Sequence, residues 1–581
     1  MKKVITVTYI SLLSVFTGII LSAQILGLLN FYYPVPVYVL SILLSCTFGF
    51  LLSKFSYHFI FESLDNSNKL PSPKWIRCTV ITFAVLLFLV VLFLPLLLWP
   101  FTGITHELNW DAGLYHFTKA AEMVVTHSSW DLSIPYGEYP YGFESLIAAS
   151  LLLSNAGYLI GCIHALILLF FTLSLFLVVN RYSRIQSEYI FFLVVAIISS
   201  YDIIRFTNLN PFMIFRVLAY TIGKNDFFLA ALMIAAIYFA PIGPDHRKFN
   251  LLGLGMTSAL ICCTKPNGVF FLGFVWILAL IRQIAIWREQ REAKKTDLAI
   301  WGTVIILILI GSLWVVRNLV VQGAIISSDT LELQNSSILA NLFNPLFYRS
   351  LGLIPLMISL LFLITLLASF FVKRIHWSIP STFGVLIVSF IITPATLYFG
   401  ASGQDLAIIF WRLGFYMLVY EVPILFLLLD PVFVWILQPK NLLIGKIVNV
   451  SLSFFMVAIS LIACYQNYSR LLLDKTNTVV LRDQYTQSVG VDGYYSAYDY
   501  VRKNVTHSVV WVDNGLPFYI YGNPLTNSVT HLKPADYQLF LQTNWNGQSG
   551  FPAYLNTDAW NKEWTLVYSD NEGRVYKRIT K

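Results

Sequence analysis

Charged residues are scarce in this sequence: they make up 12% of 581 positions, while 57% of the positions are hydrophobic. Because soluble domains carry about 25% charged residues, this composition excludes an ordinary soluble protein. Cysteine is scarce too, and its six positions lie within or at the edge of apolar stretches, without metal-ligand spacing. A disulfide framework and a cysteine-ligated metal site are therefore excluded. No nucleic-acid-binding motif is present, so the net charge of +8 does not indicate a nucleic-acid partner.

Long apolar runs dominate what is present. Most are near twenty residues long, enough to cross roughly 30 Å of hydrocarbon, and they must be helical because lipid offers no partners to backbone N–H and C=O groups. We expect the first run, after Met-Lys-Lys, to remain as an uncleaved helix. The run at 142–154 is short and amphipathic, so we expect it to lie at the membrane interface. The thirteen predicted spans are 4–29, 35–53, 78–100, 157–180, 187–204, 222–241, 250–264, 267–284, 298–316, 351–372, 378–398, 413–437 and 447–465.

Lysine and arginine are unevenly divided between the two sides of these spans. Segments on the side of the N-terminus hold 19 of the 38, the opposite loops before residue 466 hold 8, and the tail holds 11. Basic residues favour the cytoplasmic side, so the N-terminus is expected in the cytoplasm. This predicts a multi-pass protein of a bacterial inner (plasma) membrane, with its candidate site residues on the extracytoplasmic face.

Two domains are expected. Residues 1–465 form a transmembrane domain, whose first large outer loop covers 102–156. Residues 466–581 are polar and contain a helical stretch at 495–503 and strand-like stretches at 507–514, 527–532 and 564–579. The predicted fold class is therefore an all-α polytopic membrane protein with a small C-terminal extracytoplasmic α/β domain.

The loop at 102–156 concentrates acidic and aromatic residues. Asp111, near an unperturbed pKa of about 3.9, is ionised at neutral pH and can take a proton from a hydroxyl group. Tyr115 lies one helical turn further on and can stack on a sugar. The alternative is that Asp111 only caps the helix that follows it. His116 either assists Asp111 or is an ordinary interfacial histidine, and Glu144 is a further candidate acid.

Isolated charges elsewhere on the same side are further candidates. Asp226 precedes an apolar run, either as a second acid or as a helix cap. Lys265 separates two short spans; a charge at that depth is costly and indicates a partner such as a lipid-linked phosphate, unless the side chain snorkels to the surface. Arg317 and Arg412 end or begin spans, where arginine either clamps phosphate or anchors the helix.

Six polar pieces follow one another on this outer side. In order they are Trp110-Asp111 with Tyr115-His116, Tyr139 to Glu144, Gly223 to Asp226, Thr264 to Gly268, Arg317-Asn318 and Trp411-Arg412. Their order and common side resemble the GT-C superfamily, polytopic glycosyltransferases that use polyprenyl-phosphate sugars. Two features differ from many members: no second acid follows Asp111, and three predicted spans rather than one precede the loop.

The resemblance implies a GT-C-like fold and transfer of a sugar from a polyprenyl-phosphate donor to a hydroxyl of a cell-envelope glycan, lipid or protein, with inversion at the anomeric carbon. It implies Asp111 as the general base. If a divalent cation such as Mg²⁺ or Mn²⁺ takes part, Asp111 and Asp226 are its expected ligands. The expected site residues are Asp111, Asp226 and Glu144 for catalysis, and Tyr115, His116, Lys265, Arg317 and Arg412 for substrate binding.

Three other functions remain open on the sequence. A polymerase or ligase would move whole oligosaccharides between polyprenyl carriers and would need a larger groove. A transporter of lipid-linked glycans would carry charges at mid-membrane depth and related halves, whereas here the charges gather at one face. A non-enzymatic assembly scaffold is the third alternative.

Overall fold

A computed structural model describes the protein over most of its first half and its C-terminal part. The described residues are 2–62, 74–93, 97, 112–154 without 135, 159–182, 187–205, 225–240, 246–289, 293–325 and 496–579 without 513–516, 523, 531–533 and 543–549.

Helices occupy the described parts of the first nine predicted spans. The last four predicted spans, between 351 and 465, lie outside the described residues. The helices are α1 (Lys2–Leu28), α2 (Pro34–Glu62), α3 (Lys74–Leu87) with its π-helical continuation η2 (Phe88–Phe93), α7 (Ile160–Tyr182), α8 (Ser187–Arg205), α10 (Asn225–Phe239), α11 (Arg247–Thr264), α12 (Asn267–Glu289), α13 (Ala293–Gly311) and α14 (Leu313–Gln322).

Several of these helices are long and apolar enough to cross a membrane. Four pass that test alone, in α1, α2, α7 and α12, and a fifth span is possible if α13 and α14, bent by 40° at their junction, count as one. Large apolar side chains such as Ile42, Ile281 and Leu309 are exposed on the outer faces of the bundle. A soluble monomer rarely exposes such a surface, so the chain is a membrane protein.

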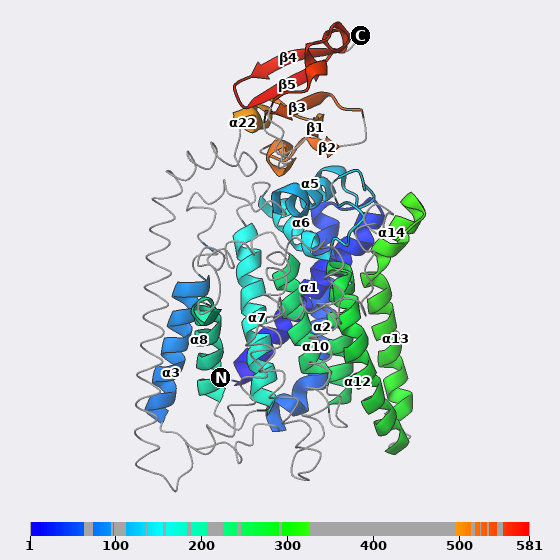
Figure 1. The fold of residues 1–581 in the computed structure, drawn as a ribbon. Helices are drawn as coiled ribbons and strands as arrows, with labels where there is room; N and C mark the ends of the chain where they lie inside the picture. Colours follow the sequence, from blue (N-terminus) through cyan, green and yellow to red (C-terminus); the bar gives the residue numbers. More distant parts are fainter. Residues whose placement is uncertain are drawn as a thin grey trace, which may run out of the picture.

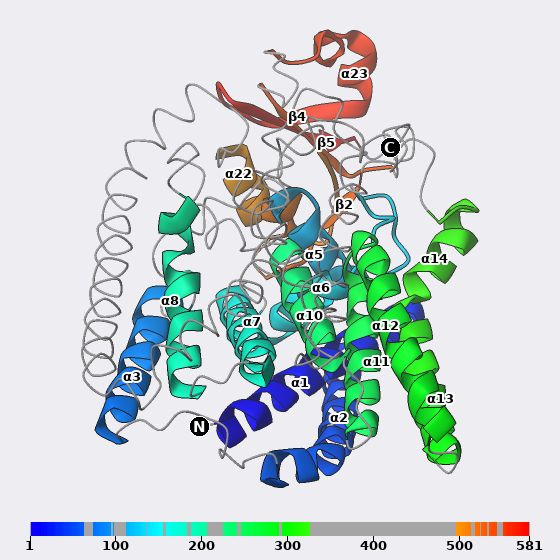
Figure 2. The same cartoon turned by 60° about the horizontal axis from the view of Figure 1, so that its bottom comes forward.

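A compact cap closes one end of the helix bundle (Figures 1 and 2). It consists of η5 (Ala112–His116), α5 (Phe117–Thr126), the loop from 127 to 141, and α6 (Gly142–Ser154). His127, at φ 56°, ends α5 in a left-handed conformation. The tyrosine Tyr38 of α2 donates a hydrogen bond to the Ala149 carbonyl oxygen at 2.8 Å, which ties α6 to the bundle.

The helix expected at 142–154 is confirmed, and every residue from Gly142 to Leu151 is buried inside the protein. A methyl group at Gly142 would lie 2.5 Å from the Cys263 Sγ atom, so this close approach of α6 to α11 requires glycine. Along these residues the helix has protein partners on all sides, which the composition of the helix alone does not reveal.

The C-terminal domain is a small α/β unit at the same end of the bundle as the cap (Figure 1). Its five-stranded sheet has the order β2-β1-β3-β5-β4, parallel from β2 to β3 and antiparallel from β3 to β4. The elements are α22 (Ser496–Asn504), β1 (Val509–Val512), η9 (Pro517–Tyr521), β2 (Ser528–Thr530), β3 (Tyr537–Leu541), η10 (Ala553–Asn556), α23 (Asp558–Glu563), β4 (Trp564–Ser569) and β5 (Gly573–Arg578).

Candidate functional site

A buried histidine–carboxylate pair lies at the centre of the cap. Glu144 comes from the first turn of α6, and its Oε1 atom is 2.7 Å from the Nδ1 atom of His116 at the end of η5. Both residues are almost fully buried. The second carboxylate oxygen, Oε2, has no hydrogen-bond donor on another described residue. One oxygen of this buried carboxylate is therefore without a partner among the described residues.

Lys119 keeps this carboxylate ionised. Burial would raise the pKa of Glu144, but the charge of Lys119 and the hydrogen bond from His116 outweigh it, so that its pKa lies below the ordinary value. Burial in turn lowers the pKa of Lys119 to about 8, with Arg317 acting in the same direction and Glu144 in the opposite one. The ammonium group lies 3.4 Å from the Tyr139 carbonyl oxygen. A buried negative charge thus has an adjacent cation that can lose its proton near neutral pH.

Aromatic rings border the pair. The ring centroid of Tyr115 lies 4.0 Å from that of His116 and 4.8 Å from that of Tyr136. Tyr139 continues the row, 5.5 Å from Tyr136. The ammonium group of Lys119 is 5.7 Å from the rings of both Tyr115 and Tyr139. Such a row of partly exposed tyrosines can stack on a sugar ring while the charged groups lie behind it.

Asp226 and Lys265 form an ion pair between two helix ends. The Lys265 Nζ atom donates to the Asp226 Oδ1 atom at 2.6 Å, and both side chains are slightly exposed, at 21% and 13%. Asn225 donates to the Thr264 carbonyl oxygen at 3.2 Å, which fixes the start of α10 against the end of α11. Phe143 connects this region to the cap, because its ring contacts both His116 and Phe228. The two expected site residues are thus paired with each other.

Arg317 holds the loop from 127 to 141. Its guanidinium group donates to the carbonyl oxygens of Ser129 at 3.1 Å and Gly137 at 2.8 Å, and it lies 4.8 Å from the Tyr141 ring centroid. The cavity beside it measures about 20 Å³, which has room for about one water molecule and not for a phosphate. A phosphate contact by Arg317 would require these hydrogen bonds to be exchanged.

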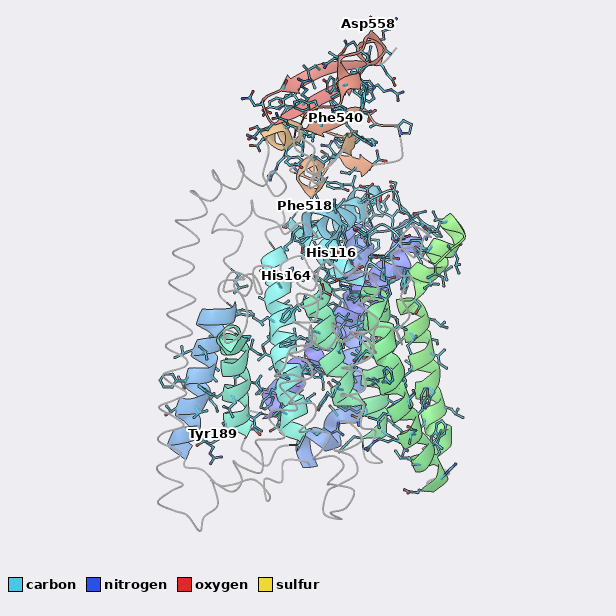
Figure 3. The ribbon with its side chains drawn as sticks, in the orientation of Figure 1. His116, His164, Tyr189, Phe518, Phe540 and Asp558 are labelled. Carbon is cyan, nitrogen blue, oxygen red and sulfur yellow. The ribbon has the colours of Figure 1, made fainter. Side chains whose placement is uncertain are left out.

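Two expected site residues, Asp111 and Arg412, lie outside the described residues. Asp111 is the residue immediately before η5, the segment that ends in His116. The described parts of the chain hold no group of three or more His, Cys, Asp or Glu side chains placed to bind a metal ion. The Asp226 Oδ1 atom accepts from Lys265, and Asp111, the other expected metal ligand, lies outside the described residues. Figure 3 shows His116 in the cap, below the C-terminal domain.

A second buried carboxylate, Glu122 of α5, was not among the predicted site residues. It accepts hydrogen bonds from the Tyr521 hydroxyl at 2.8 Å, the Ser528 hydroxyl at 2.6 Å and the Val529 amide at 3.3 Å. Phe117 packs beside it against Phe518, with ring centroids 5.2 Å apart. Burial raises the pKa of Glu122 despite these donors. Glu122 therefore joins the cap to the C-terminal domain.

The sequence carries little signal for this contact, since Glu122 and Tyr521 are 399 positions apart. Lys119 was also missed, although it is the only lysine or arginine between 102 and 156. A lone cation in an acidic loop is the pattern that could have identified it.

Comparison with known proteins adds no assignment. The sequence matches no protein-family model, and no curated protein is a significant relative.

Proposed function

We propose that the protein is an integral-membrane glycosyltransferase that moves a sugar from a polyprenyl-phosphate donor to a hydroxyl of a cell-envelope acceptor on the extracytoplasmic face. The observation that carries the proposal is the cap: Glu144, buried and ionised with one oxygen lacking a described partner, lies beside His116, Lys119 and a row of tyrosines, at one end of an apolar helix bundle. Strongly perturbed charges in a buried cluster are typical of functional sites.

Sugar transfer requires a general base and a binding site for each substrate. The acceptor oxygen forms a bond to the anomeric carbon as the bond from that carbon to the phosphate oxygen breaks, and the polyprenyl phosphate leaves with the bonding electrons. Asp111 takes the acceptor proton. Attack from the side opposite the phosphate inverts the anomeric carbon.

The remaining residues position the substrates. Lys265 and Arg412 attract the phosphate, and Lys265 reaches it by exchanging the Asp226 carboxylate for the phosphate oxygens. Tyr115 and its neighbours stack on the sugar, and Glu144 with His116 orients a sugar hydroxyl through the open carboxylate oxygen. Arg317 keeps the loop in place. Thirteen spans with a cytoplasmic N-terminus put these groups at the outer face.

The decisive experiment measures transfer from labelled polyprenyl-phosphate hexoses and pentoses to total envelope material, using the full chain in nanodiscs. Asp111→Asn should lower kcat by about 10²–10⁴-fold because it removes the base. Asp558→Asn is the matched control, since Asp558 is exposed on α23 at the far side of the C-terminal domain (Figure 3). Equal turnover by Asp111→Asn and wild type, at equal amounts of folded protein, rules out the assigned base.

A further inference from the structure

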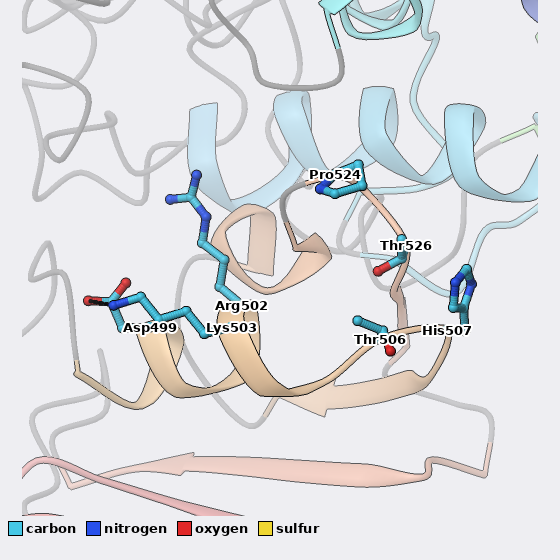
Figure 4. A pocket seen from close by; sticks show the side chains of 7 residues that line it. All are labelled: Asp499, Arg502, Lys503, Thr506, His507, Pro524 and Thr526. Carbon is cyan, nitrogen blue, oxygen red and sulfur yellow. Dashed lines mark ion pairs between the residues drawn. The ribbon is translucent and has the colours of Figure 1, made fainter.

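The C-terminal domain contains a hollow that the proposed chemistry does not use. It has a volume of about 710 Å³ and lies between α22 and the turn that leads into β2. That volume falls in the range of small-molecule sites, roughly 300–1,000 Å³. Its lining residues are Asp499, Arg502, Lys503, Thr506, His507, Pro524 and Thr526 (Figure 4).

The hollow faces the membrane domain rather than the sheet. In Figure 4 the Arg502 side chain points away from the strands and toward the helical segment of the cap. The neighbouring η9 contacts both η5 and α5 of the cap. A ligand bound in the hollow therefore lies on the same side of the C-terminal domain as the Glu122 contact.

Positive charge predominates in the lining. Lys503 approaches Asp499 at 3.9 Å, but their side chains are 71% and 40% exposed, so this pair is weak. No described residue forms a hydrogen bond or ion pair with Arg502. The last turn of a helix carries only about half a negative charge, which attracts cations but does not cancel a full guanidinium charge. The arrangement leaves Arg502 ready to bind an anion.

A buried hydroxyl group without a partner lies in the same wall. The Thr526 Oγ1 atom is inaccessible to solvent and has no hydrogen-bond partner among the described residues. Buried polar atoms are seldom left unsatisfied, because each costs free energy. In Figure 4 this oxygen points toward the side of the hollow that holds Arg502 and Thr506. A shift of this side chain that exposes the oxygen to the hollow would let a hydroxyl or acid oxygen of a ligand satisfy it.

We propose that this hollow binds an acidic saccharide, a sugar that carries a phosphate or a carboxylate group. Arg502 contacts the acid group, and Thr526 hydrogen-bonds to the sugar or to an acid oxygen. The site is separate from the cap, and the binding does not depend on catalysis. That the acidic saccharide is the acceptor of the transfer reaction rests on the proposed function.

The test measures binding directly, with the full chain in nanodiscs and isothermal titration calorimetry. The probes are glucose 6-phosphate, glucuronate, glucose and inorganic phosphate. We expect at least one acidic sugar to bind more tightly than glucose and than inorganic phosphate. Arg502→Gln should weaken that binding by about tenfold or more, the effect of losing one charged hydrogen bond, and Thr526→Val should weaken it to a smaller degree.

Arg578→Gln is the matched control, because Arg578 is a partly exposed arginine of the same domain paired with Glu563 at 3.0 Å. It should bind like wild type, and thermal unfolding should show that all variants are folded. A preference for glucose 6-phosphate identifies phosphate as the acid group, and a preference for glucuronate identifies carboxylate. The proposal is overturned if neither acidic sugar binds more tightly than glucose, or if Arg502→Gln binds as wild type does.

The two proposals, saccharide binding in the hollow and sugar transfer with Asp111 as the base, can be refuted independently. If Asp111→Asn loses transfer but the wild type binds no acidic sugar, only the proposal that the hollow binds an acidic saccharide is wrong. If Asp111→Asn transfers sugar normally and Arg502-dependent binding is present, only the assignment of Asp111 as the general base is wrong.

Discussion

Each end of the helix bundle buries a carboxylate, and the two carboxylates differ in how many of their oxygens have hydrogen-bond donors. At the end away from the C-terminal domain, Asp297 of α13 accepts from Arg247 at 2.8 Å through Oδ1, and from Gln283 at 2.8 Å and Trp287 at 3.1 Å through Oδ2. Both of its oxygens are satisfied, by residues of α11 and α12. At the other end, Glu144 has one oxygen on His116 and one without a described donor.

The difference separates a carboxylate with a complete set of donors from one whose set is incomplete among the described residues. A buried charge is tolerated when its partners are complete, and then it fixes the relative position of the elements that carry them. Asp297 does this for three helices. A buried carboxylate with too few hydrogen-bond donors destabilises the fold. Such a carboxylate is found mainly at sites where a ligand supplies the missing donor. The proposed function makes Glu144, beneath the C-terminal domain, such a site.

The largest expected effect is on transfer by Glu144→Gln. Glutamine keeps the size and an acceptor for His116 but removes the charge, so kcat should fall by about 10²-fold or more. Stability should change little, because Lys119, with a pKa of about 8, can lose its proton when its counter-charge is removed. Transfer assays and thermal unfolding on the same preparation check both. A stability loss with normal kcat would make Glu144 a structural residue like Asp297.

Asp297→Asn should show the opposite pattern. Arg247 cannot lose its proton, so the substitution leaves a cation without its partner. The cost should be roughly 3–5 kcal/mol, toward the lower end because the Arg247 side chain is 17% exposed. Denaturant unfolding in detergent measures this loss, and turnover per folded molecule should stay at the wild-type value. If turnover falls instead, the contrast between the two ends is wrong.

The smallest effect concerns Glu122, a buried carboxylate that is satisfied by the other domain. Its pKa is raised when the C-terminal domain is docked, so the docked state holds the proton more tightly than the undocked one. Docking is then most favourable at low pH and weakens as pH rises through the raised pKa. The groups facing it are Tyr521, Ser528 and the Val529 amide, with the Asp131 charge acting in the same direction as burial.

Electron–electron distance measurements between spin labels at the exposed positions Gln322 and Asn556 can follow the docking. As the pH rises through the raised pKa of Glu122, the docked fraction should fall and the distance distribution of the wild type should broaden. Glu122→Gln mimics the protonated acid and should keep one distribution throughout. An equal pH response in both proteins would show that another group controls docking.

Much of the fold could be predicted from the sequence because it depends on local patterns. Continuous apolar runs predicted the helices that the structure has in the described parts of the first nine predicted spans. Alternating β-branched and aromatic residues located β1, β2 and the β4–β5 hairpin. The strand β3 and the short helix α23 were not predicted. Tyr537 to Leu541 has no polar alternation, because β3 lies in the middle of the sheet between β1 and β5.

The candidate site was predictable only as a set of residue types. The sequence indicated Glu144, His116, Asp226 and Lys265, but no pattern indicated that they would form two separate pairs. Arg317 was expected either to bind a phosphate or to anchor its helix, and no pattern indicated that its guanidinium group would donate to carbonyl oxygens of the loop from 127 to 141. Partners of this kind come from distant positions, and a single sequence gives no distances between them.

By itself, the sequence determined that this chain is a membrane protein with helical spans and a polar C-terminal domain. Hydrophobicity and backbone hydrogen bonding act within each segment, so composition is enough to decide them. Only the tertiary structure decided that the donors to Asp297 are complete, that one oxygen of Glu144 lacks a donor among the described residues, and that Glu122 holds the C-terminal domain against the cap. Hydrogen bonds and charges act over a few ångströms, and only the folded chain brings such groups that close.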